Sequence, residues 1–307
     1  MGITLYKNAD WILTMNEKRE KFRHGDLLIS GKEILDVGND LEKKYAGKLQ
    51  IDKIINAKGT VILPGFVNVH HHTWQSLIRN IQATRGLKLE PWLTVMYEIY
   101  KDLNTDVARA GVYSGLGDML KTGCTTSNDL WYPHPIGVKY LVDAEIEAAA
   151  EIGIRFHPTR GFHSVPSDIV PPEVVDTKES VTEDTIRLVK KYHDRSRFSM
   201  CQVGIAPSIA QYETEDIIEA VVDLAEEYDI MVHGHLAESQ HEVEYTLKTW
   251  GCRPFEWFKR HRLLGKRFYF AHCIHLNEEE IEQMAETGTG VAHCPISNML
   301  LSSGACP

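Results

Sequence analysis

The sequence lacks the features of secreted, membrane-spanning and nucleic-acid-binding proteins. Its six cysteines form no C-x-x-C pair and are too few for a disulfide-stapled domain, so we expect reduced, mostly buried thiols. The apolar runs, such as Val61 to Leu63, are far shorter than the roughly 20 residues that cross a bilayer, and the N-terminus shows no signal or myristoylation pattern. With 33 basic and 43 acidic residues, the net charge of −10 argues against a phosphate-backbone partner. We therefore expect a cytoplasmic protein with no nucleic-acid or membrane partner.

Motifs for nucleotide cofactors and for helical zinc proteases are also missing. The run that begins at Gly115 has Leu120 where a dinucleotide-binding loop needs glycine, and no P-loop sequence occurs. After His241 and Glu242, Tyr245 stands where the protease motif needs its second histidine. What the chain does have is 15 histidines, a high number for 307 residues, and several of them follow apolar runs.

Two patterns of hydrophobicity divide the chain. Residues 1–60 alternate apolar and polar positions, with two short strands around the turn at Ser30-Gly31-Lys32, which predicts a small antiparallel β domain. From residue 61 onward, apolar strand-like runs alternate with longer amphipathic stretches such as 214–228, the rhythm of repeated βα units.

The second pattern predicts an α/β fold with a parallel sheet. We expect seven strands, at 61–69, 124–130, 154–160, 199–206, 230–236, 268–273 and 289–294. A TIM-type (β/α)8 barrel needs eight, and the chain stops at Pro307, just after the seventh. The sequence therefore predicts a barrel over residues 61–307 without its eighth strand.

The first chemical signal is the histidine pair at the end of the first barrel strand. His70 and His72 are two residues apart, so both imidazoles project from one face of the strand, while His71 points the other way. Active sites of such barrels lie at the carboxyl ends of the strands, and two neutral imidazoles suit a divalent metal such as zinc. The alternative is a polar strand end with solvent-facing histidines.

A second histidine pair ends the fifth strand. His235 is placed to supply a third ligand, and Glu238 follows it by three residues, in the position of a proton shuttle beside a metal-activated water. His233 lies deeper in the strand and is interpreted as a core residue.

The last two strands also end in histidine. His272 and His293 are each followed by a cysteine, and Cys273 and Cys294 alternate away from the histidines, which favours packing over metal ligation. Four of the seven predicted strands thus carry histidine at the same end of the barrel, which makes a chance surface distribution a poor explanation.

Read together, these motifs resemble the amidohydrolase superfamily, in particular its purine and triazine deaminases. The resemblance runs over essentially the whole chain and is carried by Pro64-Gly65-Phe66-Val67-Asn68 before His70-x-His72, by His235-Leu236-Ala237-Glu238, by Ala271-His272-Cys273, and by Val291-Ala292-His293-Cys294-Pro295 with Ser297-Asn298. Finer features, such as Trp74-Gln75-Ser76-Leu77 and Pro91-Trp92-Leu93, are similar to 8-oxoguanine deaminases and s-triazine hydrolases. Methylthioadenosine and adenosylhomocysteine deaminases share several of them.

The resemblance implies a TIM-barrel hydrolase with a composite β-sandwich begun by residues 1–60. It implies that His70, His72 and His235 bind one divalent metal ion, zinc or iron, together with an aspartate at the end of strand eight. Because no such aspartate follows the seventh strand here, we expect the printed sequence to be part of a longer chain. Homo-oligomers are expected only from the family.

Roles for the remaining residues follow from the same resemblance. Glu238 is expected to transfer protons, and His272 to polarise the oxygen that develops charge, with His293 outside the direct contacts. Gln75 offers an amide that both donates and accepts at a purine edge. Trp92 is interpreted either as a stacking partner for a planar ring or as a core residue, and Arg160 either as a substrate contact or as one half of a structural salt bridge.

The resemblance thus implies a hydrolase that acts on carbon–nitrogen bonds other than peptide bonds. The substrate that it implies is a purine-type heterocycle, guanine-like or 8-oxoguanine-like, from which ammonia is released. One alternative is an s-triazine hydrolase that displaces chloride or an amine by the same attack. A second alternative, from a different class, is a catalytically silent homologue that serves as a scaffold and need not hold a stoichiometric metal.

Overall fold

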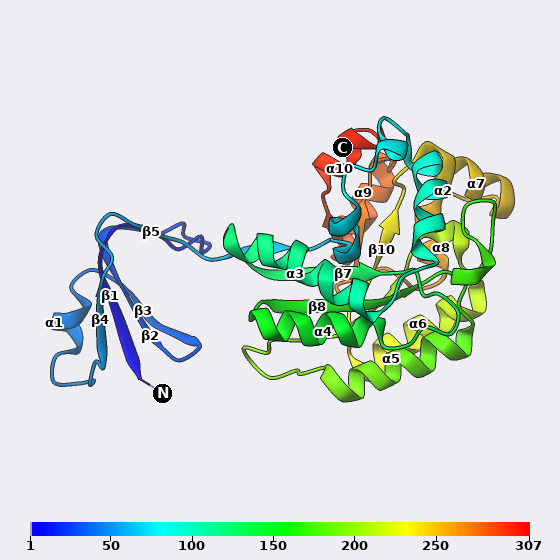
Figure 1. Ribbon diagram of the computed structural model, residues 1–307. Coiled ribbons are helices and arrows are strands. Elements are labelled where there is room, and N and C mark those ends of the chain that lie inside the picture. Colours follow the sequence, from blue (N-terminus) through cyan, green and yellow to red (C-terminus); the bar gives the residue numbers. More distant parts are fainter. Residues whose placement is uncertain (1) are drawn as a thin grey trace. The chain divides into compact units, whose positions relative to one another are not determined.

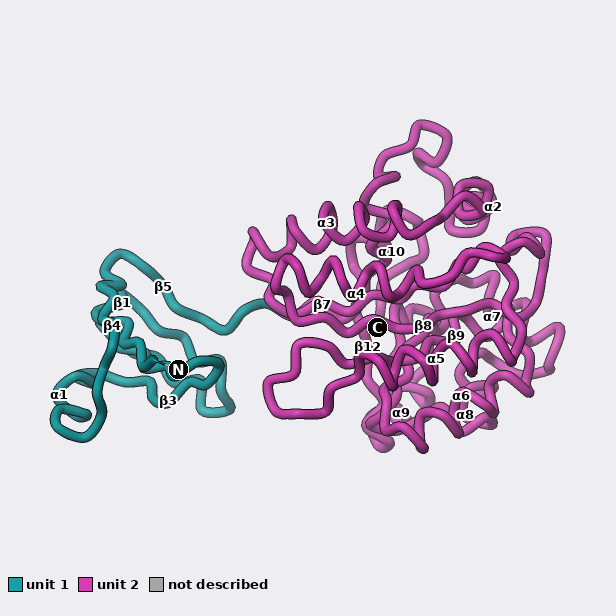
Figure 2. Tube along the Cα trace, turned by 60° about the horizontal axis from the view of Figure 1, so that its bottom comes forward, with its two compact units in different colours: residues 1–66 teal, residues 67–307 magenta. Residues whose placement is uncertain are grey.

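The computed structural model describes residues 2–307. The chain forms two compact units, residues 1–66 and 67–307, which are coloured separately in Figure 2. The boundary lies a few residues after the one expected from the sequence, because Val61–Ile62 forms a short strand, β5, that pairs with the first strand of the N-terminal unit. Pro64 and Gly65 follow β5 and interrupt the extended run, so the strand predicted over 61–69 is in fact two strands in two different sheets.

The N-terminal unit is one mixed sheet with a short helix. Its elements are β1 (Ile3–Leu13), β2 (Lys21–Ser30), β3 (Glu33–Gly38), α1 (Leu41–Tyr45), β4 (Lys53–Asn56) and β5. The hairpin predicted around Gly31 is confirmed, since β2 and β3 pair antiparallel across it. The sheet as a whole is mixed rather than antiparallel, because β4 and β5 both run parallel to β1.

The larger unit, which runs from cyan to red in Figure 1, is built on a seven-stranded parallel sheet whose strands follow one another in chain order. Its strands are β6 (Phe66–Asn68), β7 (Cys124–Trp131), β8 (Arg155–Phe162), β9 (Gly204–Pro207), β10 (Val232–Leu236), β11 (Phe268–His272) and β12 (Gly290–Ala292). All seven strands of the sequence analysis are present, and β7 and β8 extend one and two residues beyond their predicted ends, whereas the other five are shorter than predicted. The predicted TIM-type barrel without its eighth strand is therefore confirmed for the described residues.

Helices α2 to α9 lie between successive strands of this sheet, and α10 follows the last strand. They are α2 (Leu89–Tyr100), α3 (Thr105–Lys121), α4 (Leu141–Ile152), α5 (Lys178–Tyr192), α6 (Glu215–Tyr228), α7 (Gln240–Trp250), α8 (Pro254–Arg260), α9 (Glu278–Thr287) and α10 (Pro295–Leu300), with short 3₁₀ turns η1 (Thr73–Ile78), η2 (Gln82–Thr84), η3 (Pro172–Val174) and η4 (Ala210–Tyr212). The predicted helix 214–228 is confirmed as α6, whose apolar face from Ile217 to Ala225 is buried. Among the described residues, no helix combines the length and the apolar character that a membrane crossing requires.

The sheet curls strongly, and this curvature creates the site. Strands β6 and β10 are four places apart in the sheet, which in a flat sheet is about 19 Å at roughly 4.8 Å per strand. Yet the imidazole of His72, which follows β6, and that of His235, on β10, approach to 3.3 Å between their Nε2 atoms. The carboxyl ends of strands far apart in the sheet therefore converge on one point.

Candidate metal and active site

The loop that leaves β6 carries the first two histidines of the site. The rings of His70 and His72 lie edge to face with their centroids 4.8 Å apart, so both imidazoles reach the same place. His71 turns away from them, and its ring contacts the position of Gly115 on α3. The alternation expected from the sequence thus holds beyond the last residue of the strand.

Strand β10 brings His235 to this pair. One nitrogen from each of His70, His72 and His235 lies within 4.8 Å of the other two. The approach depends on Gly234, because a Cβ atom at this position would stand only 2.5 Å from the carbonyl oxygen of Pro207 on β9. The neighbouring Ser208 carbonyl accepts hydrogen bonds from both the backbone N–H and Nδ1 of His235, so the close strand contact fixes the ring.

Hydrogen bonds at the Nδ1 atoms determine which nitrogen of each ring is free. His72 Nδ1 lies 2.7 Å from the Leu130 carbonyl oxygen, and His235 Nδ1 lies 2.6 Å from the Ser208 carbonyl oxygen. A carbonyl can only accept, so each Nδ1 carries the proton and each Nε2 keeps its lone pair. This is the arrangement of metal-ligating histidines, whose second nitrogen donates to an acceptor outside the site.

The ring of His70 is set by another histidine. His233 Nδ1 lies 2.9 Å from the Tyr269 carbonyl oxygen and must donate to it, which leaves His233 Nε2 as an acceptor. His70 Nδ1 is 2.8 Å from that acceptor and therefore carries a proton, so that His70 Nε2 is free as well. His233 is fully buried, as the sequence predicts for a core residue, but it also orients a candidate ligand.

The three rings fit a divalent metal ion. The 3.3 Å between His72 Nε2 and His235 Nε2 is close to the roughly 3.4 Å edge of a zinc tetrahedron with bonds of about 2.0–2.1 Å. Burial lowers the pKa of His72 to about 3 and holds the pKa values of His70 and His235 well below their ordinary value. The imidazoles are therefore neutral at physiological pH, as metal ligation requires.

Glu238 and His272 stand beside this cluster. Glu238 Oε2 lies 3.4 Å from His272 Nε2, and the two residues are only 5% and 3% exposed. Burial, with a smaller contribution from the charge of Glu90, raises the pKa of Glu238 to about 8, so this carboxyl group is largely protonated at neutral pH. Burial lowers the pKa of His272 to about 4. A neutral acid therefore faces a neutral base at the edge of the site.

A cavity of about 1020 Å³ opens onto these residues. Gln75, from η1, and Trp92, from α2, both contribute to its wall. The amide nitrogen of Gln75 donates to the hydroxyl oxygen of Tyr100, at 2.9 Å, and to that of Tyr132, at 3.4 Å. Trp92 is half-buried and also packs against the hydrophobic core.

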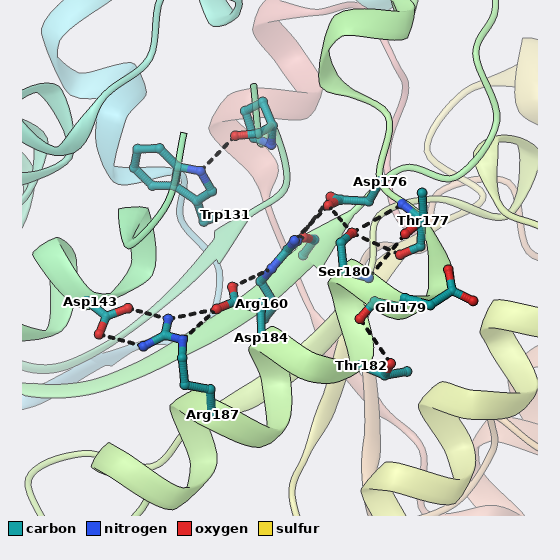
Figure 3. A network of polar contacts seen from close by, with 12 residues as sticks. Trp131, Asp143, Arg160, Asp176, Thr177, Glu179, Ser180, Thr182, Asp184 and Arg187 are labelled. Carbon is teal, nitrogen blue, oxygen red and sulfur yellow. Dashed lines mark hydrogen bonds and ion pairs between the residues drawn. The ribbon is translucent and has the colours of Figure 1, made fainter. Parts of the chain in front are cut away.

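Arg160 lies outside this cavity. Its buried guanidinium group forms ion pairs with Asp176, 2.8 Å away, and with the partly exposed Asp184, 2.9 Å away. Figure 3 shows how Asp184 in turn joins Arg187, which binds Asp143. Arg160 is 3% exposed and is not among the residues that line the cavity, an arrangement that favours the structural salt bridge over the substrate contact.

A pair of buried carboxyl groups supports the loop after His72. The backbone N–H of Thr73 donates to Asp129, with 2.5 Å between the nitrogen and Oδ1, and the Thr73 hydroxyl donates to Glu145. All three residues are fully buried. Burial raises the pKa values of Asp129 and Glu145 well above those of exposed carboxyl groups, so protons are retained within the pair.

Several residues at the site escaped sequence reasoning. Tyr132 packs between the rings of His72 and His163, with centroid distances of 5.0 and 5.2 Å. The Tyr97 hydroxyl lies 2.5 Å from His163 Nε2, and both residues line the cavity. Tyr132 and His163 follow directly after strands β7 and β8. This position at the carboxyl end of a strand is the sequence feature that could have identified them as site residues.

His293, Cys273 and Cys294 lie at different distances from the site. His293 is exposed and borders the cavity. Cys273 is buried, and its thiol contacts the Phe270 carbonyl oxygen. Cys294 lies nearer the site than its alternation predicts, since its sulfur belongs to a second group of possible ligand atoms with His70 and His272.

Named proteins with similar sequences act on heterocyclic compounds. The chain is 35% identical over 255 residues to an 8-oxoguanine deaminase from Pseudomonas aeruginosa, a match that covers 82% of this chain and 57% of that protein. It is 28% identical over 313 residues to a hydroxydechloroatrazine ethylaminohydrolase from Pseudomonas sp. strain ADP, with 99% and 65% covered. The chain therefore spans less than two thirds of the length of these relatives.

Solved structures show the same fold. An atrazine chlorohydrolase from Arthrobacter aurescens TC1 in complex with zinc superposes with a TM-score of 0.91 at 24% identity, over 99% of this chain and 68% of that one. A guanine deaminase from C. acetobutylicum, with guanine bound, gives a TM-score of 0.85 at 23% identity, over 100% and 71%. The model of the Amidohydrolase family matches residues 61–307. The chain thus belongs to the amidohydrolase family.

Proposed function

We propose that this chain carries most of the active site of a metal-dependent aminohydrolase that removes an exocyclic amino group from a purine-type heterocycle such as 8-oxoguanine or guanine. The observation that carries the proposal is the buried carboxyl group of Glu238 beside three convergent imidazoles. The name of the P. aeruginosa relative supports the substrate class.

The metal site would consist of His70, His72 and His235. A divalent metal ion, most simply zinc, supplies an activated water molecule when it is bound to such a site. The hydrogen bonds at the Nδ1 atoms hold the three rings with their Nε2 lone pairs toward one point, so little reorganisation accompanies binding.

Glu238 is the proton donor in this proposal. An amine is a poor leaving group and departs only when it is protonated, whereas chloride needs no proton. The raised pKa of Glu238, about 8, keeps a proton available near neutral pH and allows it to be returned after each turnover. This requirement favours an amine-releasing reaction over release of chloride.

Gln75 and Trp92 are the proposed substrate contacts. With the amide nitrogen of Gln75 engaged by two tyrosine hydroxyls, its carbonyl oxygen is oriented to accept from a ring N–H or an amino group. Trp92 offers an indole face in the wall of the cavity for a planar ring. Arg160 is not proposed as a contact, because both sides of its guanidinium group are already paired.

The test is an ammonia-release screen of the full-length natural protein, loaded with zinc or with iron. The substrates are guanine, 8-oxoguanine, isoguanine, cytosine, adenosine derivatives and aminotriazines. Replacing Glu238→Gln should lower kcat roughly 100- to 10,000-fold, the usual contribution of a general acid–base group, without changing the metal content. Glu244→Gln, an exposed site on α7, is the matched control and should retain full activity.

Each outcome of the screen assigns a different function. Ammonia release from purines supports the proposal, and near-normal activity of the Glu238→Gln variant would remove Glu238 from its role. Release of chloride or alkylamine from triazines alone would favour the triazine hydrolase. A protein that neither binds one equivalent of metal nor turns over any of these compounds would be the scaffold.

A further inference from the structure

Asn298 contacts a site residue from a helix outside the barrel strands. It lies on α10 and is 1% exposed, and its Oδ1 atom is 2.8 Å from His272 Nδ1. Its own backbone is held at both ends, since its N–H donates to the Cys294 carbonyl and its carbonyl accepts from Ser303. The amide is thus a fixed partner for the side of the His272 ring that faces away from Glu238.

We propose that Asn298 is a positioning residue that keeps the proton of His272 on Nδ1, so that Nε2 faces Glu238 as a hydrogen-bond acceptor. Neutral imidazole has one donor and one acceptor nitrogen, and the partner of one nitrogen determines the role of the other. With the amide oxygen at Nδ1, the lone pair stays on Nε2.

The other histidines of the site support this assignment. His72, His235 and His233 each place Nδ1 within 2.9 Å of a backbone carbonyl oxygen. Within residues 2–307, no backbone carbonyl is hydrogen-bonded to Nδ1 of His272, and the side-chain oxygen of Asn298 occupies the equivalent position. Asn298 therefore supplies with a side chain what the neighbouring strands supply to the other three rings with their backbone.

Two features indicate that the position of this ring matters. His272 and Cys273 both adopt left-handed backbone conformations, with φ values of 71° and 52°, at the end of β11. Such conformations are costly for residues other than glycine and concentrate at functional sites. In addition, the Asn298 Nδ2 atom is buried without a hydrogen-bond partner, a cost that an apolar side chain at this position would avoid.

This arrangement changes the role of His272 from the one expected by resemblance. A neutral ring with its proton on Nδ1 has no N–H at Nε2 to donate to an oxygen of the substrate. It can accept from the protonated carboxyl group of Glu238, 3.4 Å away, and so hold that acid in one orientation. The distance is at the outer limit of a hydrogen bond, as is common for catalytic groups in the absence of substrate.

The test compares three variants of the zinc-loaded full-length protein. Asn298→Leu keeps the approximate size of the side chain but removes the acceptor, whereas Asn298→Asp keeps an acceptor oxygen. Met299→Ala, at a 71% exposed position on the same helix, controls for effects on α10 itself. Zinc content and the unfolding midpoint are recorded for each, so that a misfolded variant is recognised.

The decisive readout is the ring tautomer of His272, measured by long-range ¹H–¹⁵N correlation NMR on protein labelled at histidine and assigned with a His272→Gln variant. We expect a protonated Nδ1 in the wild-type protein and in Asn298→Asp, and a changed pattern in Asn298→Leu. A proton on Nε2 in the wild-type protein, or an unchanged pattern in Asn298→Leu, would overturn the inference.

The kinetic consequence rests on the proposed function. We expect Asn298→Leu to lower kcat about 10- to 100-fold, as loss of a group that orients a site residue typically does, with KM nearly unchanged and with substantial rescue in Asn298→Asp. Equal kcat in the wild type and Asn298→Leu would show that the ring needs no such support. If the wild-type protein released no ammonia from any compound, the proposed function would fail, while the tautomer measurement would still decide the inference.

Discussion

Two polar clusters in the larger unit differ in whether their members are charged. The histidine cluster comprises His70, His72, His233, His235 and His272, and its members are neutral groups that hydrogen-bond to one another or to carbonyl oxygens. The arginine cluster, shown in Figure 3, comprises Arg160, Arg187, Asp143, Asp176 and Asp184, in which each charge faces an opposite one.

The pKa values record this difference. Burial is the largest cause that lowers the pKa of each histidine in the first cluster, and neighbouring imidazoles lower the pKa values of His70, His72, His233 and His235 further. Burial also acts to raise the pKa of Asp176, but the charge of Arg160, together with His134 and with hydrogen bonds from Arg160 and Ser180, holds this pKa below its usual value. Each arginine of the arginine cluster is paired with aspartates of the same chain. The neutral imidazoles of the histidine cluster instead offer free lone pairs that a bound metal cation could accept.

The largest expected effect comes from breaking the arginine cluster. Arg160→Met should lower the free energy of unfolding by about 3–5 kcal/mol, because Asp176 would be left buried without its partner. Urea-induced unfolding followed by circular dichroism measures this. The double substitution Arg160→Met with Asp176→Leu should recover much of the loss. A single variant as stable as the wild type would mean that the pairing contributes nothing.

The histidine cluster should respond to metal instead. Zinc at a free concentration of about 100 times its Kd should raise the free energy of unfolding by roughly 2.7 kcal/mol. His235→Ala should abolish this increase, since it removes one of three ligands, whereas His241→Ala, at an exposed position on α7, should retain it. Thermal unfolding with and without zinc gives the comparison. Full zinc stabilisation of the His235→Ala variant would refute the ligand set.

Stability should depend on pH with opposite signs near the two clusters. Asp129, which supports the loop after His72, has a folded pKa that burial raises. Its contribution to the free energy of unfolding is therefore lost as pH rises above about 4, by up to about 1.4 kcal/mol per pH unit. The folded pKa of Asp176 is lowered, so its contribution is present above about pH 4 and lost as pH falls further.

Asparagine substitutions separate these two contributions. Asp129→Asn should flatten the decline of unfolding free energy between pH 5 and pH 8, and Asp176→Asn should flatten the acid limb below about pH 4. Denaturation curves collected across this range provide the data. If both variants changed the pH dependence of the unfolding free energy over the same pH range, the two carboxyl groups would not have folded pKa values shifted in opposite directions.

The smallest effect is expected at the exposed end of the arginine cluster. Lys191 also contacts Asp143, with its Nζ atom 3.0 Å from Oδ1, but its side chain is 52% exposed. Exposed ion pairs often contribute nothing measurable, so Lys191→Ala should leave the unfolding midpoint within experimental error. A shift comparable with that of Arg160→Met would remove the distinction between the buried and the exposed parts of the cluster.

The sequence predicted the histidine cluster better than the arginine cluster. Histidines at strand ends, spaced by two residues, can be recognised because the periodicity of a strand fixes which side chains share a face. Arg160 has no such pattern, since Asp176 lies in a loop and Asp184 on α5, and neither position is related to β8 by a repeat. Its salt bridge depends on how α5 packs on the sheet, which only the folded chain specifies.

Finer features of the site were out of reach for a related reason. Asn298 appeared in the sequence as part of a motif, but its contact with His272 joins residues 26 positions apart and depends on how α10 turns back after β12. The split of the run 61–69 into two strands likewise depends on pairing with β1, a partner that local hydrophobicity does not reveal. The family resemblance supplied an expected role for His272, and the tautomer that we propose from its contact with Asn298 differs from that role.

The convergence of β6 and β10 also has a consequence for the chain as a polymer. His72 and His235 are 163 positions apart, and strands β7, β8 and β9 lie between their strands in the sheet. A metal ion held by both would act as a cross-link that closes a long loop, and closure of a long loop removes more entropy from the unfolded chain than closure of a short one. With metal bound, β6, an end strand of the described sheet, would therefore be expected to unfold together with β7, β8 and β9 rather than separately.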